Sequence, residues 1–147
     1  MNRKTRLLLL LAWAFALPAM AQAELTLVNP NLADKDELQA LPNVDDEIAQ
    51  AIIDGRPYSS AVDLDAALAG VMDDEQREAL YTRLFQPIAL NTASEAEILL
   101  IPGMSKKMAH EFVEYRPYKS MEQFRREIGK YVDDDEVARL ESYVTLN

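Results

Sequence analysis

The chain has 147 residues with 25 acidic and 15 basic side chains, so its formal net charge is −10. A chain this acidic is repelled by phosphate backbones and by anionic lipid headgroups, which argues against nucleic acid as its partner. It has no cysteine and one histidine, and it lacks the patterns of nucleophilic, nucleotide-binding and metal-binding sites. We therefore expect no catalytic residue, no cofactor and no metal site, and a binding function rather than an enzymatic one.

Residues 1–23 have the pattern of a cleaved signal peptide. Basic residues at positions 3, 4 and 6 precede an apolar run from Leu7 to about Ala16, and Ala21-Gln22-Ala23 fits a cleavage site. The run is short for a membrane span, although an uncleaved anchor is the alternative. We expect a mature chain that starts near Glu24, lies in a bacterial periplasm and does not contact the membrane.

The rest of the sequence repeats itself with a constant offset of 60 residues. The repeated residues include Asn31, Ala33, Glu37, Pro42, Ala49, Arg56, Pro57, Tyr58, Ser60, Asp73 and Leu80, which recur as Asn91, Ala93, Glu97, Pro102, Ala109, Arg116, Pro117, Tyr118, Ser120, Asp133 and Leu140. Such a repeat predicts two copies of one folded unit. We assign residues 24–88 to a first module, with 14 acidic and 4 basic residues, and residues 89–147 to a second, with 11 and 8.

Helix start and stop signals predict four short helices in each module. Asn31, Asp45, Ser60 and Asp73 are favoured N-cap residues, and Pro42 ends the first helix. The first module's helices are expected to start at these four residues, and the second module's to span residues 94–101, 106–115, 121–129 and 134–144. No stretch alternates as a strand would. The expected fold is all-α, with about eight short helices and two halves that touch.

The turns between the first two helices of each module carry a resemblance to a known family. Residues 36–53 and 95–109 each resemble a helix-hairpin-helix motif, a helix, a proline-containing turn and a second helix. Together with the segment from Leu90 to Ser94 and the repeated Arg-Pro-Tyr-x-Ser, they resemble the tandem helix-hairpin-helix domain of ComEA-type proteins. Those proteins are exported, and their best-known members bind duplex DNA during uptake. The fold also resembles PsbU, an extrinsic photosystem subunit that binds protein.

The DNA-binding form of the motif reads Leu-Pro-Gly-apolar-Gly, followed by small or basic residues. Its glycines let the backbone approach a phosphate, and the free N–H groups at the start of the next helix receive it. In the second module, Gly103, Ser105, Lys106 and Lys107 keep a glycine, an uncharged cap and two bases. These four residues are the candidate phosphate-binding site, and a basic patch could extend it. The bases of that patch would be Lys119, Arg125, Arg126 and Lys130.

The first module departs from this pattern. Asn43 and Asp45 replace the two glycines, and Asp46 and Glu47 follow. The Asp45 carboxylate is placed to accept the N–H groups that a phosphate would need. Asp45, Asp46 and Glu47 are therefore a candidate site for a protein with a basic surface. Like the acidic runs that begin at Asp73 and Asp133, they are expected to cap helices rather than to bind a metal, because they lack calcium-loop spacing.

The residues of the Arg-Pro-Tyr triplets and the single histidine each have a structural and a functional interpretation. The first consists of Arg56, Tyr58, Arg116 and Tyr118. They either end a helix and pack against the next one, which we favour, or form exposed pairs of the types that are enriched at protein interfaces. His110 is expected to be a solvated helix residue, because no second histidine or cysteine completes a metal site.

Two main functions remain open from the sequence, and an acidic metal or cation buffer is a third and weaker option. The leading hypothesis is an exported protein-interaction or scaffold module whose DNA-binding hairpins have degenerated, with an unknown periplasmic protein as partner. The alternative is a ComEA-like DNA-binding protein that acts through the second module, with duplex DNA as partner.

Overall fold

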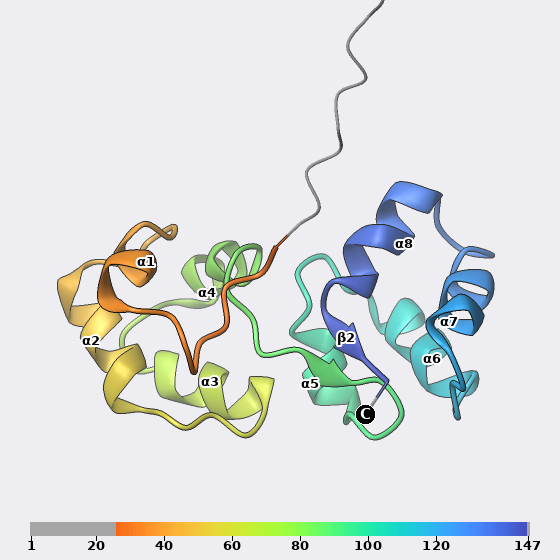
Figure 1. Ribbon diagram of the computed structural model, residues 1–147, viewed down its shortest axis with the longest axis horizontal. Coiled ribbons are helices and arrows are strands. Elements are labelled where there is room, and N and C mark those ends of the chain that lie inside the picture. Colours follow the sequence, from red (N-terminus) through yellow and green to blue (C-terminus); the bar gives the residue numbers. More distant parts are fainter. Residues whose placement is uncertain (1–25, 147) are drawn as a thin grey trace, which may run out of the picture.

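The computed structural model describes residues 26–146, which form eight helices and one pair of two-residue strands. The first module contains α1 (Lys35–Gln39), α2 (Asp46–Asp54), α3 (Ala61–Leu68) and α4 (Asp74–Tyr81). The second contains β1 (Ile88–Ala89), α5 (Glu95–Leu99), α6 (Lys106–Glu114), α7 (Met121–Ile128), α8 (Asp134–Glu141) and β2 (Val144–Thr145). Figure 1 shows the two modules side by side. The mainly helical fold is confirmed, although the short strand pair was not predicted.

The predicted signal peptide lies outside the described residues. Among the residues that are described, no helix is long and apolar enough to cross a membrane.

Each helix begins at a side chain that accepts a backbone hydrogen bond, as the cap signals predicted in most cases. Asp45 accepts from the N–H of Ile48 at 2.9 Å, and Ser60, Asp73, Ser94, Ser105, Ser120 and Asp133 cap their helices in the same way. The prediction was wrong for the first helix, whose N-cap is Asp34 rather than Asn31. A capping bond satisfies one of the N–H groups that have no partner within the helix, so local sequence was sufficient to place most helix starts.

Asn31 instead binds the backbone of a distant residue. Its Oδ1 accepts a hydrogen bond from the N–H of Tyr58 at 2.7 Å, and its Nδ2 donates to the carbonyl oxygen of Tyr58 at 2.9 Å. Asn91 binds Tyr118 in the same way and at the same two distances. An amide side chain can donate and accept at once, so it pairs with a peptide unit as another backbone would. This pair of bonds ties the entry of each module to the segment before its third helix.

Each module is closed by a short parallel pairing of its first and last segments. Val28 pairs with Leu84, and β1 pairs with β2 so that Ile88 lies opposite Val144. The second pairing is the first one displaced by the repeat offset. Ile88 thus has the same place in the second pairing as Val28 has in the first.

The two modules are in direct contact. Tyr143, which is 1% exposed, donates from its hydroxyl to the carbonyl oxygen of Tyr81 at 3.0 Å. Its ring packs edge-on against Phe85, with the two ring centroids 5.0 Å apart, and α3 also contacts α5. The buried apolar residues of both modules form one continuous core. The prediction that the two halves touch is confirmed.

Candidate functional site

The first module's hairpin turn is occupied by its own side chains. Asn43 has a φ of +60°, a left-handed conformation that asparagine tolerates better than most residues and that glycine adopts in the DNA-binding form. Asp45 caps α2, and Asp46 follows it with an ion pair to Lys35 at 2.8 Å. This ion pair and its hydrogen bond lower the pKa of the Asp46 carboxyl. Asp45, Asp46 and Glu47 are exposed, so the turn presents negative charge where a phosphate would bind.

The second module's turn combines a glycine in the left-handed conformation with an uncharged cap residue. Gly103 has a φ of +74°, and the Ser105 hydroxyl accepts from the N–H of Met108 at 3.1 Å. Within the described part of the chain, α6 is the one helix whose first turn has no acidic residue. Lys106 and Lys107 are exposed there. The four candidate residues therefore lie at one helix start, with positive charge and a neutral cap.

The predicted basic extension of this site is largely neutralised by carboxylates. Arg125 makes two hydrogen bonds to Glu141, at 2.7 and 2.5 Å. Arg126 and Lys130 both pair with Glu127. Because each guanidinium or ammonium group already has an anionic partner, these three side chains offer little net charge to a phosphate. These ion pairs weaken the predicted extension of the site without removing its exposed bases.

A groove of about 390 Å³ separates the two modules next to this turn. We call it the intermodule groove. One wall consists of Asp65, Asp74, Arg77, Glu78 and Tyr81 of the first module, and the other of residues 99–104 of the second. Gly103 lies on this second wall, whereas Lys106 and Lys107 do not line the groove. A phosphate at Gly103 would therefore face three carboxylates of the first module.

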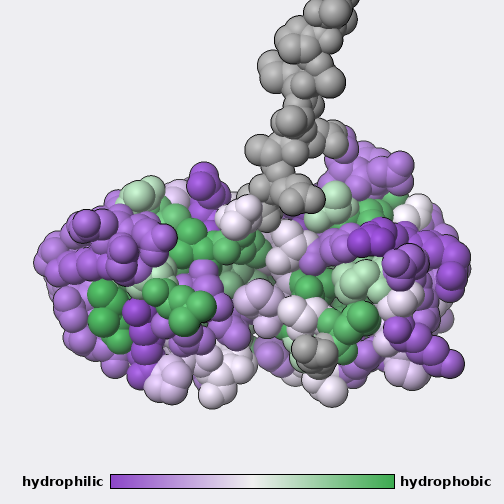
Figure 2. Space-filling model, viewed as in Figure 1, coloured by the Kyte–Doolittle hydropathy of each residue, from purple (hydrophilic) through white to green (hydrophobic). Residues whose placement is uncertain are grey.

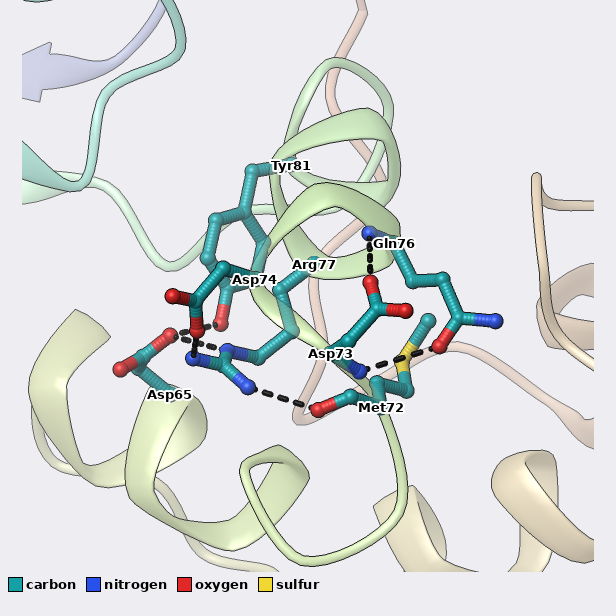
Figure 3. Close-up of polar contacts among 7 residues, drawn as sticks. All are labelled: Asp65, Met72, Asp73, Asp74, Gln76, Arg77 and Tyr81. Atoms are coloured by element: carbon teal, nitrogen blue, oxygen red, sulfur yellow. Dashed lines mark hydrogen bonds and ion pairs between the residues drawn. The ribbon is translucent and has the colours of Figure 1, made fainter.

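Arg77 organises the acidic wall (Figure 3). Its Nε donates to Asp65 at 2.9 Å, its Nη2 to Asp74 at 2.5 Å and its Nη1 to the carbonyl oxygen of Met72 at 2.7 Å. Tyr81 donates to the same Asp65 oxygen at 2.8 Å. Burial and this hydrogen bond to Asp65 raise the pKa of the Tyr81 hydroxyl. The network holds α4 against α3 and fixes the shape of this wall.

Sequence reasoning missed the residues of this wall. Asp65, Arg77, Glu78 and Tyr81 correspond to Arg125, Val137, Ala138 and Glu141 in the second module, so the repeat gives no sign of this wall.

The Arg-Pro-Tyr triplets are structural. Tyr58 and Tyr118 are 4% and 3% exposed, and Tyr58 donates to the carbonyl oxygen of Ile52 at 2.9 Å. Burial is the main cause that raises the pKa of both tyrosine hydroxyls. The burial of the two tyrosines supports the favoured, structural interpretation of the triplets over the alternative of exposed Arg/Tyr pairs.

The two arginines of these triplets bind backbone of their own module. Arg56 donates to the carbonyl oxygens of Pro30 and Ala33 at 2.7 and 2.5 Å. Arg116 donates to the carbonyl oxygens of Leu90 and Ala93 at 2.7 and 2.8 Å. Burial lowers the pKa of the Arg116 guanidinium. These bonds anchor the entry loop of each module, which explains why the triplet recurs.

His110 is exposed, with its Nε2 atom 3.6 Å from a carboxylate oxygen of Glu114. Among residues 26–146, no group of three histidine or acidic side chains is arranged to hold a metal ion.

Comparisons with known proteins bear on the second module. A family model described as a helix-hairpin-helix motif matches residues 85–144. Comparison with curated proteins and with solved structures returned no match. The matched segment begins at the junction between the modules and includes the Gly103 turn, α6 and the strand-paired ends. Residues 85–144 therefore contain a helix-hairpin-helix motif, a binding motif found in recognition of nucleic acid or of protein.

Proposed function

We propose that this chain is a non-catalytic, exported binding module of the periplasm that recognises another protein rather than DNA. The observation that carries the proposal is the position of the Gly103 turn, which shares the intermodule groove with three carboxylates. Anionic side chains beside a phosphate site oppose the charge neutralisation on which DNA affinity depends. The exposed acidic residues of the first module favour a partner with a basic surface.

A count of free cations supports the same conclusion. In the second module's described part, Lys106, Lys107 and Lys119 have no carboxylate partner, whereas Arg116 binds backbone carbonyl oxygens and the remaining bases pair with carboxylates. If all three contacted phosphates, the logarithm of the DNA association constant would fall with the logarithm of salt concentration with a slope of about −2.7. Proteins with useful duplex affinity draw on more contacts than this.

The second candidate is a DNA-binding protein like the ComEA-type proteins that the sequence resembles. It is favoured by one observation, the uncharged cap and the exposed Lys106 and Lys107 at the start of α6. Binding would then use the second module alone. The resemblance to PsbU supports protein binding, which is the leading proposal.

Titration with a labelled random-sequence duplex, at low and then physiological salt, separates the two functions. We expect no saturable binding of residues 24–147 at physiological salt. Micromolar binding that weakens steeply with salt and is lost in a Lys106→Glu/Lys107→Glu variant would establish the DNA function and refute the proposal. An Arg83→Glu variant, which reverses an exposed charge of the first module outside the turn, is the control.

A positive test of protein binding uses site-specific photo-crosslinking in cells. A photoreactive residue at position 46, 47 or 78 should give a discrete protein adduct. The photoreactive residue placed at position 107 tests the start of α6 in the second module. Adducts to DNA from position 107, without protein adducts from the first module, would contradict the proposal.

A further inference from the structure

We infer that the intermodule groove binds a segment of the partner protein in which lysine or arginine lies beside aliphatic side chains. The inference rests on the proposed protein-binding function and names the chemistry of the segment and the place where it docks. The two walls of the groove differ in character, because one is acidic and the other is apolar.

The acidic wall has negative charge that the fold does not compensate. Among the described residues that line the groove, Arg77 is the one basic side chain. That side chain is only 13% exposed, because Asp65, Asp74 and a carbonyl oxygen surround it. Glu78 is exposed and makes no ion pair or hydrogen bond within the described residues. Three carboxylates against one arginine leave an excess of two negative charges that face the groove.

The opposite wall is apolar. Leu99, Leu100 and Met104 are half-buried, with one side packed on the core and the rest accessible from the groove. Pro102 and Gly103 complete the turn and contribute no charge. Figure 2 shows that hydrophilic residues cover most of the visible face of both modules and that hydrophobic residues form small patches.

These two walls select the partner's chemistry. An anionic ligand is repelled by the carboxylates, and a purely apolar segment would cover Asp74 and Glu78 without supplying a counter-charge, which is costly. A cation without an apolar part would leave the apolar wall exposed to water. A segment that carries both kinds of side chain satisfies both walls.

The size of the groove sets the kind of contact. Its volume of about 390 Å³ lies near the lower end of the range of about 300–1,000 Å³ for ligand pockets. Such a volume holds a few side chains of one peptide segment and excludes a folded surface or a duplex. The groove exists because α4 and the α5–α6 turn come from different modules, so the docking site depends on both.

The test selects random peptides displayed on phage against residues 24–147. Selected peptides should combine lysine or arginine with leucine, isoleucine or methionine. Their affinity, measured by fluorescence anisotropy, should fall at least about tenfold in Glu78→Lys and in Leu99→Gln. Asp36→Lys is the matched control, because it makes the same charge change at an exposed position of the first module outside the groove, and it should change affinity less than about twofold. Circular dichroism verifies that each variant is folded.

The possible failures are distinguishable. If no peptide is enriched, or if enriched peptides lack basic residues or bind Glu78→Lys as tightly as the unmodified chain, the groove assignment is overturned. If binding survives Glu78→Lys but is lost in Asp46→Lys/Glu47→Lys, the partner docks on the α2 turn, which overturns the groove while the protein-binding function stands. Duplex binding through Lys106 and Lys107 would instead overturn the proposed function itself.

Discussion

Replacement of Tyr143 tests whether the two modules unfold as one body. Tyr143→Phe removes only the hydroxyl that donates to Tyr81, and a typical hydrogen bond contributes about 1 kcal/mol to the free energy of unfolding. Tyr143→Ala also removes a ring that is 1% exposed. Truncation of a buried aromatic residue to alanine costs about 3–5 kcal/mol, which includes about 0.5–1.5 kcal/mol from the edge-on contact with Phe85. We expect losses of about 1 kcal/mol and about 4–5 kcal/mol.

Urea unfolding followed by circular dichroism measures both losses. With a slope of about 2 kcal/mol/M for a domain of this size, the alanine variant's midpoint should fall by about 2 M. Arg83 occupies the position that corresponds to Tyr143 in the repeat and is exposed. Arg83→Ala is therefore the matched control and should change stability by less than about 0.5 kcal/mol. An unfolding midpoint in Tyr143→Ala that stays within about 0.5 M of the parent's would refute the reasoning, because the modules would then not depend on this contact.

Three further predictions concern the fold and its titration. Gly103→Ala should lower the free energy of unfolding by about 1 kcal/mol, because the φ of Gly103 is +74°. Gly70→Ala is the control: an added Cβ meets nothing within 4 Å there, so this change should be neutral or stabilising by up to about 1 kcal/mol. Equal melting temperatures of the two variants would contradict this. Asn31→Ala and Asn91→Ala should each cost about 2–4 kcal/mol in urea unfolding, because each leaves a tyrosine N–H and C=O without a partner. Hydrogen bonds from Lys130 and Arg126 lower the pKa of the Glu127 carboxyl below its value in the unfolded chain. The ionised Glu127 side chain therefore stabilises the fold above about pH 4.3. This stabilisation is lost as the pH falls through the lower pKa of the folded state. Glu127→Gln should therefore lose less stability than the parent on acidification from about pH 5 to about pH 2, and parallel stability curves for the two proteins would argue against this.

Helix positions could be predicted because their signals are local. Asp45, Ser60 and Asp73 cap helices in the structure as their sequence positions indicated, since a cap bonds to an N–H only three residues away. The Gly103 turn was recognisable for the same reason. Asn31 shows the limit of this reasoning, because its type fits an N-cap but its side chain binds Tyr58, which is 27 residues away.

The candidate site was predicted in part. The four residues at the start of α6 were identified because they lie within five positions of one another in the sequence. The intermodule groove was not, because its walls lie on segments separated in sequence, from Asp65 to Tyr81 and from residue 99 to residue 104. The ion pair between Arg125 and Glu141 was not predictable, because the two residues are 16 positions apart in the sequence and meet only in the fold.

The sequence by itself determined the repeat, the helical class, most helix starts and the loss of glycines in the first hairpin, since all of these follow from residues close together or from the comparison of one copy with the other. Only the tertiary structure decided how the modules meet. The Tyr143 hydroxyl reaches a carbonyl oxygen 62 residues earlier, and the ends of each module pair across nearly its full length. Such contacts depend on how the apolar faces of several helices pack together, so the apposition of the acidic and apolar walls could not be derived from local patterns.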